Sequence, residues 1–254
     1  MLPSFIMAYE SDERSGVIKL VEQAKKRLQK LEEERKRIWK LQEYERKYGQ
    51  YTYICGIDEV GRGPLAGPVV AGAVILPKDC DILYINDSKK LTAAKREELY
   101  DEIMEKAVAA GIGMVSPQRI DEINILQATY EAVRKIYPKT DPEVFHTYEE
   151  MREDIRKLEP APDILLNDAV TIPEVTIPQV PIIKGDAKSI SIGAASIIAK
   201  VTRDRLMVEY DQILPEYGFA SNKGYGSAEH IAALKKYGPS PIHRRSFIHN
   251  FIEE

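Results

Sequence analysis

The chain has 254 residues, of which 44% are apolar and 30% are charged, and its formal net charge is −4 at pH 7; this is the composition of an ordinary soluble globular protein. No apolar run reaches the length of a membrane span, and the first residues, MLPSFIMAYESDERSG, lack the basic and apolar regions of a secretory signal. Two cysteines offer no disulfide framework, which favours a cytoplasmic location and no membrane partner.

The first 50 residues are predicted to form a helical extension. Residues 16–48 contain no proline and no internal glycine, and apolar residues recur at steps of three and four from Val17 to Tyr44. This spacing is typical of an apolar stripe on one long helix, or on two helices broken near the charged run 32–37. The extension could dock on the main domain, pair with a partner helix, or add basic contacts to a long ligand. Nothing in its residues is catalytic.

The main domain, residues 51–254, is predicted to be of the α/β class. Runs of β-branched and other apolar residues predict strands at 52–58, 68–76, 111–116, 163–168 and 180–184. Helical spacing and capping residues predict helices at 92–110, 119–137, 144–158, 188–213 and 227–237. The first two strands follow each other directly and later strands alternate with helices. We therefore expect a mixed five-stranded sheet flanked by helices.

Charge is distributed unevenly along the chain. The net charge is +3 over residues 1–50, −9 over residues 51–183 and +4 over residues 184–250. An acidic half beside a basic tail could form a metal site next to a phosphate-binding face. Ordinary scatter of surface charge accounts for the same numbers equally well.

The most informative segment is ICGIDEVGRGPLAGPVVAG, residues 54–72. Its apolar run ends in two adjacent carboxylates, Asp58 and Glu59, and Gly61-Arg62-Gly63 follows at once. Two like charges out of water are costly unless a cation or a proton compensates them. Glycines on either side of a cation let the backbone approach an anion closely. A strand end followed by a solvated turn is the plainer interpretation, but the combination favours a metal-and-phosphate site.

Two further aspartates, Asp168 and Asp186, also follow apolar runs. If the strands are neighbours, their carboxyl ends bring four carboxylates to one crevice, although each aspartate taken singly is more typical of a turn or cap. Oxygen donors without His or Cys suit Mg²⁺ or Mn²⁺, and two such ions can activate a water for phosphodiester cleavage. Asp204 competes for the fourth place, but flanking arginines inside a predicted helix favour a structural role for it.

Other segments could contact a nucleic acid. Lys89 lies in DSKKL, residues 87–91, just before a predicted helix, where an anion can bind, and Lys184 precedes Gly185-Asp186. Tyr225, between two glycines and near Lys223, could stack on a base or sugar. Solvated helix faces and a surface tyrosine are the plainer alternatives. His243-Arg244-Arg245 could bind phosphate or stabilise the C-terminal fold, and the sequence leaves this open.

Together these segments resemble type 2 ribonuclease H, the bacterial ribonuclease HII family. The resemblance spans residues 54–247 nearly in full. Its matching pieces are DEVGRGPLAGPVVAGAVIL at 58–76, DSKKLT at 87–92, IDEINI at 120–125, LLNDAVT at 165–171, IIKGDAKSISIGAASIIAKVTRDRLM at 182–207, YGFASNKGYGSAEH at 217–230 and PIHRRSF at 241–247.

The resemblance implies a ribonuclease-H-like fold and an endonuclease that hydrolyses the RNA strand of RNA–DNA hybrids. It also implies cleavage 5′ to single ribonucleotides in duplex DNA, leaving 3′-hydroxyl and 5′-phosphate ends, with two Mg²⁺ or Mn²⁺ ions. The partners implied are the hybrid and ribonucleotide-containing duplex DNA; we expect a monomer, and protein partners stay open. By similarity the metal site falls on Asp58, Glu59, Asp168 and Asp186, the glycine-arginine-glycine element on Gly61, Arg62 and Gly63, and a substrate-sensing tyrosine on Tyr225.

The sequence departs from the family pattern in places. Asn167 stands where the family more often has an aliphatic residue, residues 138–156 look like an insertion, and the N-terminal stretch varies among relatives. Arg62 and the helical N-terminus argue against the sister enzyme, ribonuclease HIII, which has a lysine between the glycines and a β-rich platform. A non-catalytic hybrid-binding module is the main alternative, and a nucleotide triphosphatase lacks any Gly-x-x-x-x-Gly-Lys-Ser/Thr loop.

Overall fold

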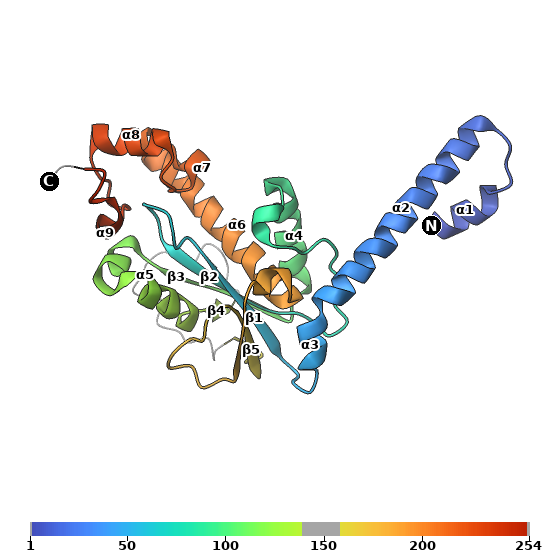
Figure 1. Ribbon diagram of the computed structural model, residues 1–254, viewed down its shortest axis with the longest axis horizontal. Helices are drawn as coiled ribbons and strands as arrows, with labels where there is room; N and C mark the ends of the chain where they lie inside the picture. Colours follow the sequence, from blue (N-terminus) through green and yellow to red (C-terminus); the bar gives the residue numbers. More distant parts are fainter. Residues whose placement is uncertain (1, 139–157, 253–254) are drawn as a thin grey trace.

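The computed structural model describes residues 2–138 and 158–252 (Figure 1). The helix expected at 144–158 and almost all of the insertion expected at 138–156 lie outside these residues. The helices are α1 (Leu2–Tyr9), α2 (Ser15–Leu41), α3 (Glu43–Lys47), α4 (Ala93–Lys106), α5 (Pro117–Arg134), α6 (Ile190–Ile213), α7 (Phe219–Asn222), α8 (Ala228–Tyr237) and α9 (Arg245–Ile248), with short 3₁₀ turns η1 (Ser88–Lys90), η4 (Gly185–Ala187) and η5 (Pro215–Tyr217). Within the described part of the chain, none of these helices could cross a bilayer.

The strands form one mixed sheet in the order β4-β3-β2-β1-β5-β6. β1 is antiparallel to β2 and parallel to β5, and β5 is parallel to β6. The five expected strands are present, and a two-residue strand pairs at the β3 edge. Their bounds are β1 (Ile54–Val60), β2 (Val69–Ile75), β3 (Ala109–Val115), β4 (Tyr137–Pro138), β5 (Ile164–Asp168) and β6 (Gln179–Ile182).

Helices cover both faces of this sheet (Figure 1). On one face, α4 and α6 bury apolar residues against β2, and on the other, α5 packs against β1, β2 and β3. The helices α4, α5, α6 and α8 each begin at a capping residue. Its hydroxyl accepts a hydrogen bond from the backbone N–H three residues later, which stabilises the start of the helix. The caps are Thr92, Ser116, Ser189 and Ser227.

Two glycines let α6 lie directly on the centre of the sheet. A Cβ atom at Gly56 in β1 would stand 2.1 Å from the carbonyl carbon of Ser191, and one at Gly72 in β2 would stand 2.5 Å from the oxygen of Ala195. Gly72 pairs with Asp58 across the two strands. The close approach therefore brings the first turns of α6 next to the end of β1 that carries Asp58.

The N-terminal extension is partly an arm and partly a member of the core. α1 and α2 project from the body, and Ile6 of α1 packs on Val21 and Ala24 of α2 (Figure 1). Toward its end α2 enters the core, where Ile38 and Leu41 are buried against α4 and α6. The long helix runs unbroken through residues 32–37 and ends at Leu41, and α3 follows at Glu43–Lys47. The stretch 16–48 therefore forms two helices, but the break lies at Gln42 and not near residues 32–37.

Glu45 of α3 anchors the extension to the start of α6. Its Oε1 accepts hydrogen bonds from the Ser189 hydroxyl at 2.6 Å and from the Ser191 backbone N–H at 3.1 Å. A carboxylate at a helix N-terminus is favourable, because unpaired N–H groups and the helix dipole point toward it. Residues from about 34 onward therefore belong to the structure that supports α6.

Some sequence-based boundaries are wrong. The helix expected at 92–110 ends at Lys106, and the chain enters β3 at Ala109, because Ala109–Val115 pairs along the whole length of β2. β1 continues to Val60, so Asp58 and Glu59 lie inside the strand and not after it. α5 bends at Asn124, which has a φ of 67°, and α1 was not expected.

The contact at Gly56 predicts a specific loss of stability. Gly56→Ala should lower the free energy of unfolding by about 1–3 kcal/mol, because the added methyl overlaps the α6 backbone, which cannot move aside cheaply. For a chain of this size, each kcal/mol corresponds to a fall in Tm of about 2–4 °C. Gly16→Ala in α2 is the control, because a Cβ there meets nothing within 4 Å. Equal melting temperatures for the two variants would contradict the packing argument.

Candidate active site

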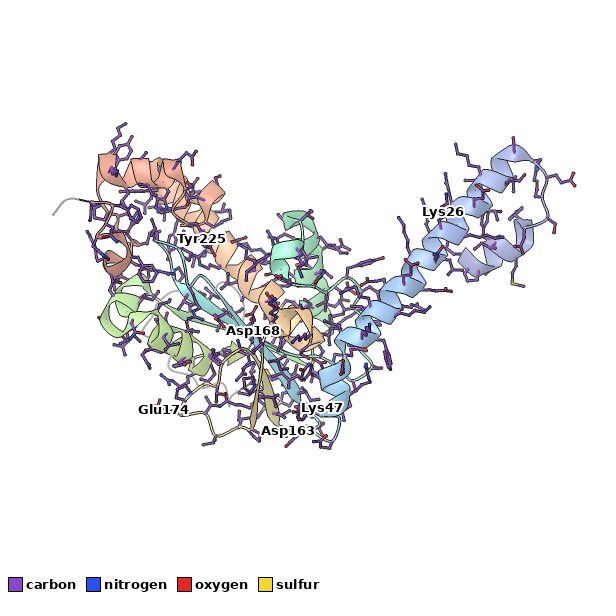
Figure 2. All side chains as sticks on the ribbon, in the orientation of Figure 1. Lys26, Lys47, Asp163, Asp168, Glu174 and Tyr225 are labelled. Carbon is purple, nitrogen blue, oxygen red and sulfur yellow. The ribbon has the colours of Figure 1, made fainter. Side chains whose placement is uncertain are left out.

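The four predicted carboxylates lie at neighbouring strand ends. Asp58 and Glu59 are in the last three residues of β1, Asp168 ends β5, and Asp186 lies in η4 four residues after β6. These three strands are adjacent and parallel, so their carboxyl ends share one edge of the sheet. Figure 2 shows Asp168 at this edge, close to the first turns of α6.

Asp58 is the most perturbed of the four. Burial raises the pKa of Asp58 well above its ordinary value, and the charges of Glu59 and Asp168 add to the effect. The Ser196 hydroxyl of α6 and the backbone N–H of Glu59, at 2.8 Å, donate to the carboxylate and oppose that rise. Ser196 Oγ is in turn 2.9 Å from Ser88 Oγ in η1. A buried hydroxyl pair thus supports Asp58 from two elements.

The same causes act on Glu59 and Asp186. Burial raises the pKa of Glu59, and the Arg62 guanidinium, 3.2 Å from Oε1, opposes this rise. Burial also raises the pKa of Asp186, and the neighbouring charges of Asp87 and Asp168 raise it further. Lys89 lowers the pKa of both Glu59 and Asp186. One exposed lysine therefore stands near two carboxylates from different parts of the chain.

A backbone turn fixes Asp168 relative to Asp186. Lys184 adopts the left-handed conformation with a φ of 57°, and the Gly185 N–H then donates to Asp168 Oδ1 at 2.7 Å. A Cβ at Gly185 would stand 2.5 Å from Ile192 Cδ1 of α6, so a larger residue here would require the Ile192 side chain to move. The Lys184 side chain is exposed, and its clearest contribution here is the conformation of its backbone.

Asp87 is a site member that sequence reasoning missed. It was read only as part of an anion-binding segment before a helix, whereas its side chain hydrogen-bonds with Asp186. Asp87 is the N-cap of η1, and its Oδ1 accepts a hydrogen bond from the Lys89 N–H at 3.0 Å. This places the start of η1 beside the acidic edge, the edge of the sheet that carries the four carboxylates. The sequence around Asp87 does not show this role, because Asp186 is distant in the chain and meets Asp87 only in the folded protein.

The donor set fits a divalent cation by its chemistry. Several carboxylates share a partly buried site with raised pKa values, and a cation would relieve the repulsion that raises them. Among the described residues, no group of three His, Cys, Asp or Glu side chains lies close enough together to hold an ion.

Two fully buried arginines support the Gly61–Pro68 loop from the interior of the protein. Arg244 donates to the carbonyls of Gly61 at 2.5 Å and Gly67 at 2.7 Å, and also to that of Arg62. Arg203 donates to the carbonyl of Pro68 at 2.9 Å and to that of Ala66. Burial lowers the pKa of Arg244 to about 9 and that of Arg203 to about 10, so both stay charged at pH 7.

The same loop is joined to the Tyr225 turn. The Leu65 N–H donates to the Gly224 carbonyl at 2.8 Å, and Arg203 donates to the Lys223 carbonyl at 2.9 Å. A Cβ at Gly63 would stand 3.8 Å from Cε1 of the Tyr225 ring, which is 44% exposed. The glycine-arginine-glycine element and Tyr225 therefore form one continuous surface.

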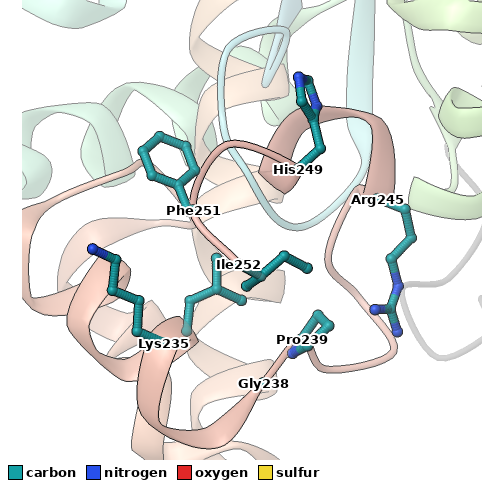
Figure 3. Close-up of a pocket in the computed structure, with 8 residues that line it drawn as sticks. Lys235, Gly238, Pro239, Arg245, His249, Phe251 and Ile252 are labelled. Carbon is teal, nitrogen blue, oxygen red and sulfur yellow. The ribbon is translucent and has the colours of Figure 1, made fainter. Parts of the chain in front are cut away.

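The remaining candidates lie elsewhere. Asp204 pairs with Lys200 at 2.7 Å and with Arg96 at 3.9 Å, within the contact between α6 and α4. His243 and Arg244 are buried and bind protein groups, so the structural alternative holds for these two. Arg245, the third residue of that segment, lines a pocket of about 730 Å³ that includes none of the four carboxylates (Figure 3). The lining residues are Leu234, Lys235, Gly238, Pro239, Arg245, His249, Phe251 and Ile252.

Comparison with known proteins finds close relatives. A family model described as ribonuclease HII matches residues 55–250, and one described as ribonuclease HII N-terminal domain matches residues 2–49. Ribonuclease HII of Lachnoclostridium phytofermentans is 67% identical over 242 residues, covering 95% of this chain and 88% of that protein. Ribonuclease HII of Clostridioides difficile is 49% identical over 250 residues, covering 98% and 91%.

Solved structures agree with this result. Ribonuclease H2 from Pyrococcus horikoshii is 29% identical with a TM-score of 0.57, covering 76% of this chain and 93% of that one. A structure of the PCNA:RNase HII complex from Archaeoglobus fulgidus gives 28% identity and a TM-score of 0.55, covering 79% and 97%. These neighbours show the same ribonuclease-H-like fold.

The electrostatics of Asp58 predict a pH-dependent stability effect. Because its folded pKa is raised, its protonated form stabilises the fold below the ordinary carboxyl pKa of about 3.9, and this stability is lost as pH rises through the folded pKa. In metal-free buffer at pH 8, Asp58→Asn should therefore melt at a higher temperature than the parent, and the difference should shrink toward pH 4. Differential scanning calorimetry at both pH values tests this, with the exposed Asp79→Asn as control. A lower Tm for Asp58→Asn at pH 8 would refute it.

Proposed function

The chain belongs to the ribonuclease HII family, and we propose that it cleaves 5′ to single ribonucleotides embedded in duplex DNA by two-metal catalysis. Membership makes it a ribonuclease H, a hydrolase that cuts RNA–DNA hybrids endonucleolytically. The observation that carries the finer proposal is the group of carboxylates at adjacent strand ends, bordered by Arg62 and Lys89. The expected monomeric state and cytoplasmic location stay predictions.

Asp58, Glu59, Asp168 and Asp186 are the residues that would hold Mg²⁺ or Mn²⁺. When bound, two such ions would supply an activated water and stabilise the leaving 3′-oxygen. The protein's own part is to hold the carboxylates: Ser196 donates to Asp58, and the Gly185 N–H donates to Asp168. Arg62 and Lys89 add positive charge where a phosphate would approach, and Lys184 is a further candidate contact.

Recognition of the ribonucleotide would use the surface shared by the loop and the Tyr225 turn. The 2′-hydroxyl is what tells RNA from DNA at a matched site. Gly63 is exposed and has no side chain to keep the backbone from this hydroxyl, whereas Gly61 has a φ of 88° and faces inward, where a Cβ would stand 2.3 Å from Arg203 Nε. The Tyr225 ring, beside Gly63, could stack on the sugar of the following nucleotide, where a second 2′-hydroxyl would crowd it. This arrangement supports a site that reads an RNA-to-DNA junction.

The catalytic proposal predicts that single carboxylates are essential. Asp58→Asn and Asp186→Asn should each lower metal-dependent cleavage by at least about 100-fold, or about 2.7 kcal/mol of transition-state stabilisation, while the protein stays folded. The assay maps products on a duplex with one ribonucleotide, with Mg²⁺ and Mn²⁺ compared, and Asp81→Asn is the matched control.

Each outcome of this assay decides something. Cleavage on the 5′ side that starts with metal and stops with chelator excludes the non-catalytic hybrid-binding module. A parent enzyme that cuts long hybrid but leaves the single ribonucleotide intact would limit the function to hybrids. Near-parental turnover by either variant would remove that carboxylate from the catalytic site.

Tyr225 is predicted to act on the substrate and not on the metal. Tyr225→Ala should lower cleavage at a single ribonucleotide by about 10- to 100-fold, because stacking on one base or sugar contributes about 1–3 kcal/mol. Metal binding, followed by calorimetry, should be retained. Tyr225→Phe should keep much of the activity if stacking dominates, and little if the phenol hydroxyl makes a contact. Tyr237→Ala, which removes another exposed tyrosine, is the control.

The arm is predicted to add phosphate contacts. Replacing Lys19, Lys26, Arg27 and Lys30 of α2 by Gln should weaken hybrid binding and make log Kd less steeply dependent on log salt, because each lost phosphate contact lowers the slope by about 0.9. These residues precede the docked part of α2, so folding should be unaffected. Unchanged affinity at every salt concentration would leave the arm a role in stability or partner binding.

A further inference from the structure

Two buried histidines lie directly behind the Tyr225 turn. His230 belongs to α8, and His243 precedes α9; their rings are 0% and 2% exposed. The two Nε2 atoms are 2.9 Å apart. At one end of the pair, the Ser240 backbone N–H donates to His243 Nδ1 at 3.0 Å, and the Ser240 hydroxyl oxygen is 2.7 Å from the same nitrogen. At the other end, His230 Nδ1 is 2.8 Å from the Tyr225 carbonyl oxygen.

The partners at each end fix where the protons must be. A backbone N–H only donates, so His243 Nδ1 is the acceptor, and the Ser240 hydroxyl, which can donate or accept, then points its own hydrogen toward Nδ1 or away from the pair. In the neutral ring the His243 proton is therefore on Nε2. That Nε2–H donates to His230 Nε2, which is then the acceptor, and the His230 proton is on Nδ1. The Tyr225 carbonyl only accepts, so it completes the chain. The hydrogen bonds therefore run in one direction, from the Ser240 N–H through His243 and His230 to the Tyr225 carbonyl. If either ring carried its proton on the other nitrogen, two donors or two acceptors would face each other.

The surroundings keep both rings in the neutral form that this chain requires. Burial lowers the pKa of His243 to about 4, and the charges of His230 and Arg245 contribute. Burial also lowers the pKa of His230. The rings of Tyr217 and Phe219 pack against the pair, with centroids 4.9 Å from His243 and 5.3 Å from His230.

We infer that the His243–His230 pair is a positioning element that fixes the Tyr225 turn for discrimination of a single ribonucleotide. The pair holds the Tyr225 carbonyl, whose second donor is the Ser227 N–H at 2.8 Å. His243 also forms a backbone bridge with Ala66, and the N–H of the next residue, Gly67, donates to the Ile242 carbonyl. The histidines thus connect both halves of the recognition surface, and the inference rests on the proposed role of Tyr225.

A matched set of substitutions tests this role. His230→Leu removes both ring nitrogens at similar volume, whereas the side-chain amide of His230→Asn can present an N–H where Nδ1 stands. His230→Leu should lower cleavage at a single ribonucleotide about 10-fold with a much smaller effect on long hybrid, and His230→Asn should recover much of it. Leu99→Ala, a fully buried apolar truncation in α4, away from the recognition surface, should leave the ratio of the two activities unchanged at a temperature well below its Tm.

The double variant separates the inference from the proposal beneath it. If the histidine acts through the tyrosine, His230→Leu should cause no further loss of single-ribonucleotide cleavage in the Tyr225→Ala background. Loss in Tyr225→Ala but none in His230→Leu overturns the inference and leaves the role of Tyr225 intact. Equal losses on both substrates, or independent losses in the double variant, reduce the pair to a stabilising core contact. Full activity of Tyr225→Ala overturns both.

A measurement independent of activity checks the proton arrangement. ¹⁵N NMR of the imidazole rings at pH 7.5 should show His243 protonated on Nε2 and His230 on Nδ1, both neutral. The opposite tautomer on either ring, or a charged ring at this pH, would contradict the directed chain.

Discussion

Two buried guanidinium groups hold the substrate-facing half of this molecule in shape. Within the described part of the chain, the guanidinium groups of Arg203 and Arg244 donate hydrogen bonds to main-chain carbonyls of residues 61–68 and Lys223, and to no carboxylate. A buried charge is tolerated only when its hydrogen bonds are satisfied, so the loop carbonyls must stay turned inward. The conformation of the glycine-arginine-glycine element is thus a requirement of the core and is present before substrate arrives.

At the acidic edge, in contrast, the charged groups are not fully compensated by their surroundings. Its carboxylates repel one another in a partly buried place, and the repulsion is only partly offset by Arg62, Lys89 and the Ser196 hydroxyl. Such a site lowers the stability of the free protein in return for affinity toward a cation, a compromise that functional sites often show. The close contact of α6 with Gly56 and Gly72 keeps the fold rigid around it.

The sequence predicted structural features that depend on residues close together in the chain. It did not predict features that depend on contacts between distant segments. Apolar runs that end in acids predicted the strands and the four carboxylates, because both signals lie within a few residues of each other. Asp87 escaped because its partner, Asp186, is distant in the chain and meets it only through the packing of η1. The start of β3 was misplaced for the same reason, since pairing with β2 overrode the helical preference of an alanine-rich run.

The bond between Glu45 and Ser189 joins residues 144 positions apart, so it has a consequence for how the chain is made. The extension leaves the ribosome early, yet the start of α6 that it caps emerges only after most of the protein has been synthesised. At about 5–20 residues per second, Glu45 waits on the order of 10–30 s for its partner. Strand β1 can pair with β2 soon after both are made, but its edge toward β5 and the face that Gly56 presents to α6 stay unpaired for much of the same interval.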